Sequence, residues 1–198
     1  MGRYLAVLTI LAVVLFFPIG NLQATPEAGV FAGLQKKVSS LKLGKGEYYI
    51  AHKLTSEQKE KGEKNLQEKS YPGTYTFTDK DIHVLAEKDT DTIIAVYLKN
   101  EEADKGQFKQ MVADLMMQFG DPTSEAHDQI IYWAYSETGK ISGDQYAALK
   151  KEGNVPIIAT VKFKSKLNFT EIDGEDNLEN SIYYIISSPG LLEKFYNQ

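Results

Sequence analysis

Three histidines are the side chains of this sequence that best suit proton transfer or metal binding: His52, His83 and His127. Glu125 and Asp128 flank the last of them, so an acid could orient that imidazole. Metal binding needs several ligands on one side of an element, and none of the three stands in a standard spacing such as H-E-x-x-H. We therefore interpret them as structural or exposed residues, and we expect no metal ion and no cofactor.

Motifs for nucleophilic and nucleotide chemistry are absent from the sequence. It has no cysteine, no G-x-S-x-G turn, no Walker glycine loop and no G-x-G-x-x-G after a strand. We therefore predict no catalytic residue and no enzyme. One alternative stays open, a hydrolase that cleaves an envelope polymer with paired carboxylates, because a sequence cannot show which acids converge in a cleft.

An acidic segment, Glu171–Asp176, suggests calcium because oxygen ligands cluster around Gly174. Aligning that glycine with the glycine of an EF-hand loop puts Phe169 at the first ligand position and Asn180 at the last. The EF-hand motif therefore fails. A looser surface calcium site and a solvated loop remain as alternatives, and we favour the loop.

A stripe of lysines favours binding over catalysis. In residues 160–166, TVKFKSK, strand alternation turns Val161 and Phe163 to one side and Lys162, Lys164 and Lys166 to the other. Three ammonium groups in a row could dock an anionic glycan, an acidic peptide or a lipid head group. The alternative is that they discourage aggregation along an exposed strand and pair with the acidic segment.

Strand aromatics form a second candidate group. The run Ile130–Tyr135, IIYWAY, puts Trp133 and Tyr135 on the same face of a strand. If that face is solvated, the two rings could stack on sugars or anchor a partner protein. If it faces the helix described next, they are core residues. We retain both, with the three lysines, as the candidate ligand-binding residues.

A strongly periodic helix must position these strands. Within Lys105–Thr123, KGQFKQMVADLMMQFGDPT, apolar side chains recur at spacings of three and four and so share one stripe. Gly120 suits a C-terminal cap, and Pro122 prevents continuation. Strand-like runs stand on both sides, at residues 73–78, 82–87, 92–99, 129–135, 157–166 and 181–187. We predict an α+β fold in which an antiparallel sheet of about five to six strands carries this central amphipathic helix on one face.

The remaining segments predict shorter elements: a helix at residues 25–43, a strand at 47–53, and helices at 142–151 and 189–197. Residues 55–70 are almost wholly polar, although Thr55 and Gln58 fit a capping box. Because Leu66 is the only apolar side chain inside this stretch, we expect it to bury no face.

Residues 1–24 have the form of a secretory signal peptide, with Arg3, an apolar run over residues 4–17 and Ala24 at the predicted cleavage point. The run is shorter than the roughly 20 residues that cross a membrane, so we expect membrane contact only if the segment stays uncleaved. We expect a periplasmic or secreted bacterial protein. Its mature part, residues 25–198, is expected to be one domain, in which 25–70 precede the sheet region at 71–198.

Charge argues against a nucleic-acid partner. The formal net charge is −5, and Arg3 is the only arginine, so removal of the signal leaves lysine as the sole cation and the net charge at −6. Arginine is the residue that binds phosphate with two parallel hydrogen bonds, so a mature chain without it is poorly suited to nucleic acid.

The order strand, strand, helix, strand, strand runs from Tyr71 to Ser187, with FGDP at Phe119–Pro122 closing the helix and Tyr132-Trp133 in the next strand. This organisation resembles small α+β modules of bacterial envelope proteins of unknown function, including those built like the β-lactamase inhibitor protein. The resemblance implies a binding or assembly module, and no site residue is carried over from it. We therefore predict a non-enzymatic binding module whose partner is an envelope protein or a glycan. A structural component of an envelope complex is the remaining alternative.

Overall fold

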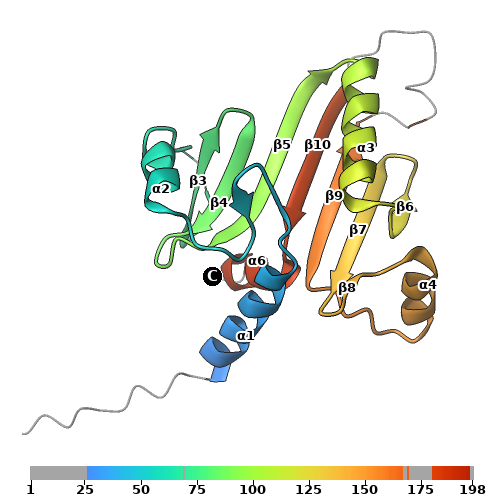
Figure 1. Ribbon diagram of the computed structural model, residues 1–198, viewed down its shortest axis with the longest axis horizontal. Coiled ribbons are helices and arrows are strands. Elements are labelled where there is room, and N and C mark those ends of the chain that lie inside the picture. The colour runs from blue at the N-terminus through green and yellow to red at the C-terminus, as the bar shows by residue number, and fades with distance from the viewer. Residues whose placement is uncertain (1–25, 69, 167–168, 170–179, 197–198) are drawn as a thin grey trace, which may run out of the picture.

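Runs of β-branched and aromatic residues build the main sheet, which has eight strands in a computed structural model that describes residues 26–68, 70–166, 169 and 180–196 (Figure 1). The strands are β3 (Thr74–Asp79), β4 (Ile82–Glu87), β5 (Ile93–Ala103), β6 (Ser124–Ala126), β7 (Ile130–Ser136), β8 (Gly139–Lys140), β9 (Ala159–Ser165) and β10 (Asn180–Ser187). Their order is β3-β4-β5-β10-β9-β7-β6, with β8 paired to β7, and all pairings are antiparallel. The α+β class is as predicted. The predicted count of five to six strands is wrong, because β6 and β8 are too short to leave an alternating pattern.

Two segments considered above lie outside the described residues: the predicted signal peptide at 1–24 and the acidic segment Glu171–Asp176. Within the part of the chain that is described, no helix combines the length and the apolar character needed to cross a membrane.

The central helix α3 (Lys105–Phe119) forms where the apolar stripe predicts it. Asp104 caps its start, because the Asp104 carboxylate accepts from the Gln107 backbone N–H while the Gln107 side chain accepts from the Asp104 N–H. Gly120 ends it with a φ of +70°, a conformation that favours glycine. Inner apolar residues of the stripe meet the sheet: the Phe108 ring lies 5.5 Å from that of Phe163 on β9. We call the side of the sheet that α3 covers the inner face (Figure 1).

One unbroken row of apolar side chains runs across the inner face and forms the centre of the core. Neighbouring members are paired in register from β3 to β7, and each is 0% exposed. The row consists of Phe77, Val84, Val96, Ile186, Val161 and Trp133. Because side chains alternate along a strand, the residues next to these point to the opposite side, which we call the outer face.

Parts of the N-terminal segment also pack on the inner face. This segment contains α1 (Pro26–Ser40), β1 (Gly44–Lys45), β2 (Tyr48–Tyr49) and α2 (Ser56–Glu63). The strand predicted at 47–53 is reduced to β2, which pairs with β1 in a separate two-stranded hairpin. Tyr48 packs edge-on against Phe77 with 5.7 Å between ring centroids, so the hairpin joins α3 on the same side of the sheet.

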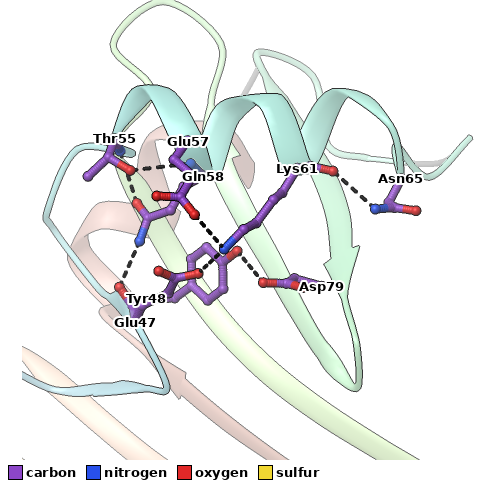
Figure 2. Close-up of polar contacts among 8 residues, drawn as sticks. All are labelled: Glu47, Tyr48, Thr55, Glu57, Gln58, Lys61, Asn65 and Asp79. Carbon is purple, nitrogen blue, oxygen red and sulfur yellow. Dashed lines mark hydrogen bonds and ion pairs between the residues drawn. The ribbon is translucent and has the colours of Figure 1, made fainter.

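Helix α2 begins with the predicted capping box, in which Thr55 and Gln58 bond reciprocally (Figure 2). The expectation that this polar stretch buries no face is wrong. The Gln58 side chain is buried and donates to the Glu47 carbonyl at 2.9 Å. Gly62 lies so close to the Phe77 ring that a β-carbon there would come within 3.0 Å of it. The helix therefore packs through a glycine and an amide rather than through an apolar stripe.

Two further helices complete the structure. Helix α4 (Gly143–Lys151) starts at Ser142, whose hydroxyl accepts from the Gln145 N–H in another capping box. Helix α6 (Pro189–Tyr196) follows β10 directly, and its Leu191 is buried in the core. Both helices lie where the sequence predicts them.

Candidate functional site

The outer face of the sheet gathers the lysines that the sequence singles out. Lys162 is half-buried on β9, Lys164 is exposed two positions later, and Lys166 is exposed just beyond the end of the strand. Val161 and Phe163 between them are fully buried on the inner face, so the predicted alternation is confirmed.

A fourth lysine reaches the same face from a strand that is not a neighbour of β9. On β10, Tyr183 pairs with Lys164 on one side and with Lys99 of β5 on the other. The two ammonium-bearing side chains therefore flank one tyrosine ring across three strands. Lys99 also contacts the carboxylate of Glu101 on its own strand, and both groups of that pair are about half exposed or more.

Tyrosine rings lie between the lysines. Tyr132 of β7 pairs in register with Lys162, whose Nζ atom stands 5.5 Å from the centre of the Tyr132 ring. Such a cation–π contact is worth about 0.5–1 kcal/mol at an exposed site. On β5, Tyr97 stacks on His83 with 4.6 Å between ring centroids and 4° between planes. Flat apolar surface and positive charge therefore alternate across this face.

Trp133 and Tyr135 are core residues, which is the other alternative that the sequence left open. Trp133 is 0% exposed, its ring lies 6.0 Å from that of Phe119 on α3, and its Nε1 donates to the Gly120 carbonyl at 2.7 Å. Tyr135 is also buried, and burial raises the pKa of its hydroxyl to about 12. Neither ring can stack on a sugar from this position. Tyr132, one position along the same strand, is the ring that faces outward.

Two adjoining hollows indent the outer face. The first, which we call the lysine hollow, has a volume of about 410 Å³ and is lined by Lys99, Lys164, Lys166, Gln129 and Tyr183 among others. The second, which we call the tyrosine hollow, has a volume of about 440 Å³ and is lined mainly by Tyr71, Leu85, Tyr97, Tyr183, Ile185 and Leu192. Because Tyr183 lines both, the two hollows form one continuous surface.

The histidines do not form a metal site among the described residues, where no group of three or more potential ligands occurs. His52 and His127 are exposed. His83 is half-buried, with Nδ1 2.6 Å from the Gln67 amide and 3.1 Å from the Thr78 hydroxyl. Burial lowers the pKa of His83, an effect that the nearby Asp81 carboxylate partly opposes.

A separate cleft of about 640 Å³ lies on the inner side, between α3 and the β1–β2 hairpin. Three carboxylates line it, and all three are exposed: Asp81, Asp104 and Asp114. Asp104 is engaged in capping α3, and Asp114 accepts from the Gln110 amide at 2.7 Å. This cleft therefore does not supply the buried pair of carboxylates that the hydrolase alternative needs. Tyr184 also lines it, and the Tyr184 hydroxyl is buried without a hydrogen-bond partner in the described structure.

Sequence reasoning missed Lys99, Tyr97 and Tyr183 as members of the outer face. A usable signal existed, since Tyr97 and Lys99 alternate with the buried Val96 and Leu98 along one strand, as the lysines of β9 alternate with buried residues. Comparison of the chain with protein-family models, with curated proteins and with solved structures gives no match.

Proposed function

We propose that this protein is an exported, non-enzymatic binding module that takes an anionic partner on the outer face of its sheet. The observation that carries the proposal is the convergence of Lys99, Lys162 and Lys164 from two strands separated by β10, with tyrosine rings between them. The export is proposed from the signal-like pattern of residues 1–24.

Charge supports an anionic partner. The chain as a whole is acidic, with a formal net charge of −5, so a face that gathers lysines is a local exception. Exposed charges act over about 10 Å at 0.1 M salt. The lysines of β5 and β9 are separated by a single strand, so their charges can act together on one partner. A single lysine on a strand is common, whereas lysines aligned through the register of three strands present several donors to one partner.

The tyrosines support a partner that has rings or apolar groups as well as charge. Tyrosine offers a flat apolar surface with a polar tip, and it is enriched where proteins bind other molecules. An envelope glycan or protein that carries carboxylate, sulfate or phosphate groups combines these features. It is the class of partner that we propose.

The test compares two double variants that remove the same charge from different places. Lys99→Gln with Lys164→Gln alters the outer face, and Lys150→Gln with Lys151→Gln alters exposed lysines of α4. The probes are dextran sulfate and poly-L-glutamate, with affinity measured by calorimetry at several salt concentrations. We expect the outer-face pair to lower the affinity about tenfold or more, equivalent to ~1.4 kcal/mol, and the α4 pair to leave it unchanged.

Added salt should weaken the binding of the unaltered protein to both probes, because screening reduces exposed charge interactions. Equal losses in the two double variants would show only a general charge effect. Absence of binding to either probe at low salt would also refute the proposal.

A further inference from the structure

We infer that the outer face binds a single-chain anionic amphiphile, a fatty-acid-like molecule whose carboxylate meets the lysines and whose chain occupies the tyrosine hollow. The inference rests on the anionic partner of the proposed function, and it gives an amphiphile, in place of a glycan or protein, as the ligand class of the same face. It is carried by the contact between two hollows of opposite character, one cationic and one largely apolar, that share the Tyr183 side chain.

The register fixes how close the two hollows are. Lys99 and Lys164 stand on either side of Tyr183, and Tyr97 is paired with Ile185 one step further along the same strands. Two residues along an antiparallel strand span about 7 Å. A chain whose carboxylate is held between the lysines therefore reaches Tyr97 and Ile185 about 7 Å further on, beyond its first methylene groups.

The tyrosine hollow has the size and lining of a small-molecule site. Its volume of about 440 Å³ falls within the usual range of about 300–1,000 Å³ for ligand pockets. Leu85 and Ala95 on the sheet form part of its floor, and Leu192 of α6 contributes to the wall. A neutral sugar would leave hydroxyl groups unpaired against these aliphatic side chains, whereas an alkyl chain would not.

The positive charge of the lysines favours an amphiphile with an acidic head group over one with a cationic head group. Lys99 and Lys164 line the end of the surface next to Tyr183. Among the described residues, the carboxylate in contact with this pair is that of Glu101, on Lys99. A fatty-acid carboxylate would meet Lys164 and would compete with Glu101 for Lys99. A cationic amphiphile would meet repulsion at the same position.

The experiment measures the affinity of the full chain for butyrate, octanoate and the neutral octyl glucoside by calorimetry, below their micelle concentrations. We expect octanoate to bind much more tightly than butyrate, by about fourfold for each methylene group that is buried. We also expect a negative heat-capacity change for octanoate, the mark of apolar burial. Octanoate binding no tighter than that of butyrate would overturn the inference.

Two variants separate the head from the chain. Lys99→Gln with Lys164→Gln should weaken octanoate about tenfold and leave octyl glucoside unchanged. Ile185→Thr, which keeps a β-branched strand residue, should weaken octanoate and octyl glucoside alike and spare butyrate. Ile130→Thr is the matched control, because Ile130 is half-buried on the same face and does not line the tyrosine hollow, and it should change none of the three.

The failure of this inference is distinguishable from that of the proposed function. If dextran sulfate binds through Lys99 and Lys164 while octanoate gains nothing over butyrate, the face binds anions and the amphiphile is wrong. If octanoate and octyl glucoside bind equally and the lysine pair has no effect, the anionic role itself is wrong.

Discussion

The two faces of the sheet are made from the same strands and have opposite characters. On the inner face, every position of the central row from Phe77 to Trp133 is fully buried under α3 and the N-terminal hairpin. On the outer face, one matching row of positions is half-buried throughout and consists of Thr78, His83, Tyr97, Ile185, Lys162 and Tyr132. The buried apolar contacts of the inner face stabilise the fold. The side chains of the outer face contribute little to stability and are available for binding.

The contrast between the two faces shows what decides whether an aromatic residue of this sheet is buried in the core or available on the outer face. Tyr132 and Trp133 are adjacent in the chain, and so are Tyr183 and Tyr184, yet each pair is divided between the two faces. The residue type therefore does not show whether an aromatic side chain lies in the core or on the outer face, whereas its register in the sheet does. Each of the following experiments applies a similar change at a more buried position and at a more exposed one.

Trp133→Ala should have the largest effect, a loss of about 3–5 kcal/mol in the free energy of unfolding, because it opens a cavity beneath α3 and removes the bond to Gly120. Tyr132→Ala on the outer face should lose no more than about 1 kcal/mol. Urea unfolding followed by circular dichroism measures both. Similar losses in the two variants would contradict the division between the faces.

Thr123→Val should cost about 1–3 kcal/mol. The buried Thr123 hydroxyl donates to the Ile141 carbonyl at 2.5 Å and accepts from the Ala134 N–H at 3.0 Å, so the variant leaves two backbone groups unpaired. Thr160→Val makes the same chemical change on the outer face, where water can replace the hydroxyl, and should stay within about 0.5 kcal/mol. If urea unfolding gives the same free energy of unfolding for Thr123→Val as for the unaltered protein, water must enter this site.

Tyr184→Phe should raise the stability by about 1 kcal/mol, since it removes a buried hydroxyl that has no partner in the described structure. Tyr183→Phe, one residue away on the outer face, should leave the stability unchanged. Thermal unfolding of both variants gives the comparison. A loss of stability in Tyr184→Phe would show that an ordered water or a ligand already bonds to this hydroxyl.

The smallest effect concerns pH and His83 on the outer face. Burial lowers the pKa of His83 below the ordinary value of 6.5, so the unfolded chain binds this proton more readily than the folded one. The contribution of neutral His83 is fully present above about pH 6.5 and is lost as the pH falls from there through the lowered pKa. Asp81 raises this pKa and Lys99 lowers it further, and both act less strongly than burial.

His83→Gln should therefore lose less stability than the unaltered protein between pH 7 and pH 5, measured by urea unfolding at each pH. His127→Gln removes an exposed histidine and is the control for the loss of an imidazole. Parallel slopes for His83→Gln and the unaltered protein would contradict the burial of neutral His83.

Local patterns were sufficient to predict the elements with strong periodicity. The apolar stripe and Gly120 define α3, and the alternation of Val161, Lys162, Phe163 and Lys164 places the lysines on one side of β9. Capping boxes at Thr55 and Ser142 occur where small polar residues precede glutamine by three positions. These features depend on neighbours within a few residues of each other.

Features that depend on distant neighbours could not be predicted in the same way. In IIYWAY both alternating sets are apolar or aromatic, so the pattern does not tell which set faces α3. The partnership of Lys99 with Lys164 needs β10 between their strands, and this pairing joins segments far apart in the chain. The packing of α2 through Gly62 depends on the position of Phe77, which no local pattern reveals.

The place of β10 in the sheet has a consequence for the order in which the molecule is completed. It follows all the other described strands in the sequence, yet it lies between β5 and β9, in the middle of the sheet. A ribosome halted before Asn180 would hold two half-sheets with open edges at β5 and β9, each able to pair with another chain. The two half-sheets can therefore join only after β10 has been made, and until then their open edges must be shielded from other chains.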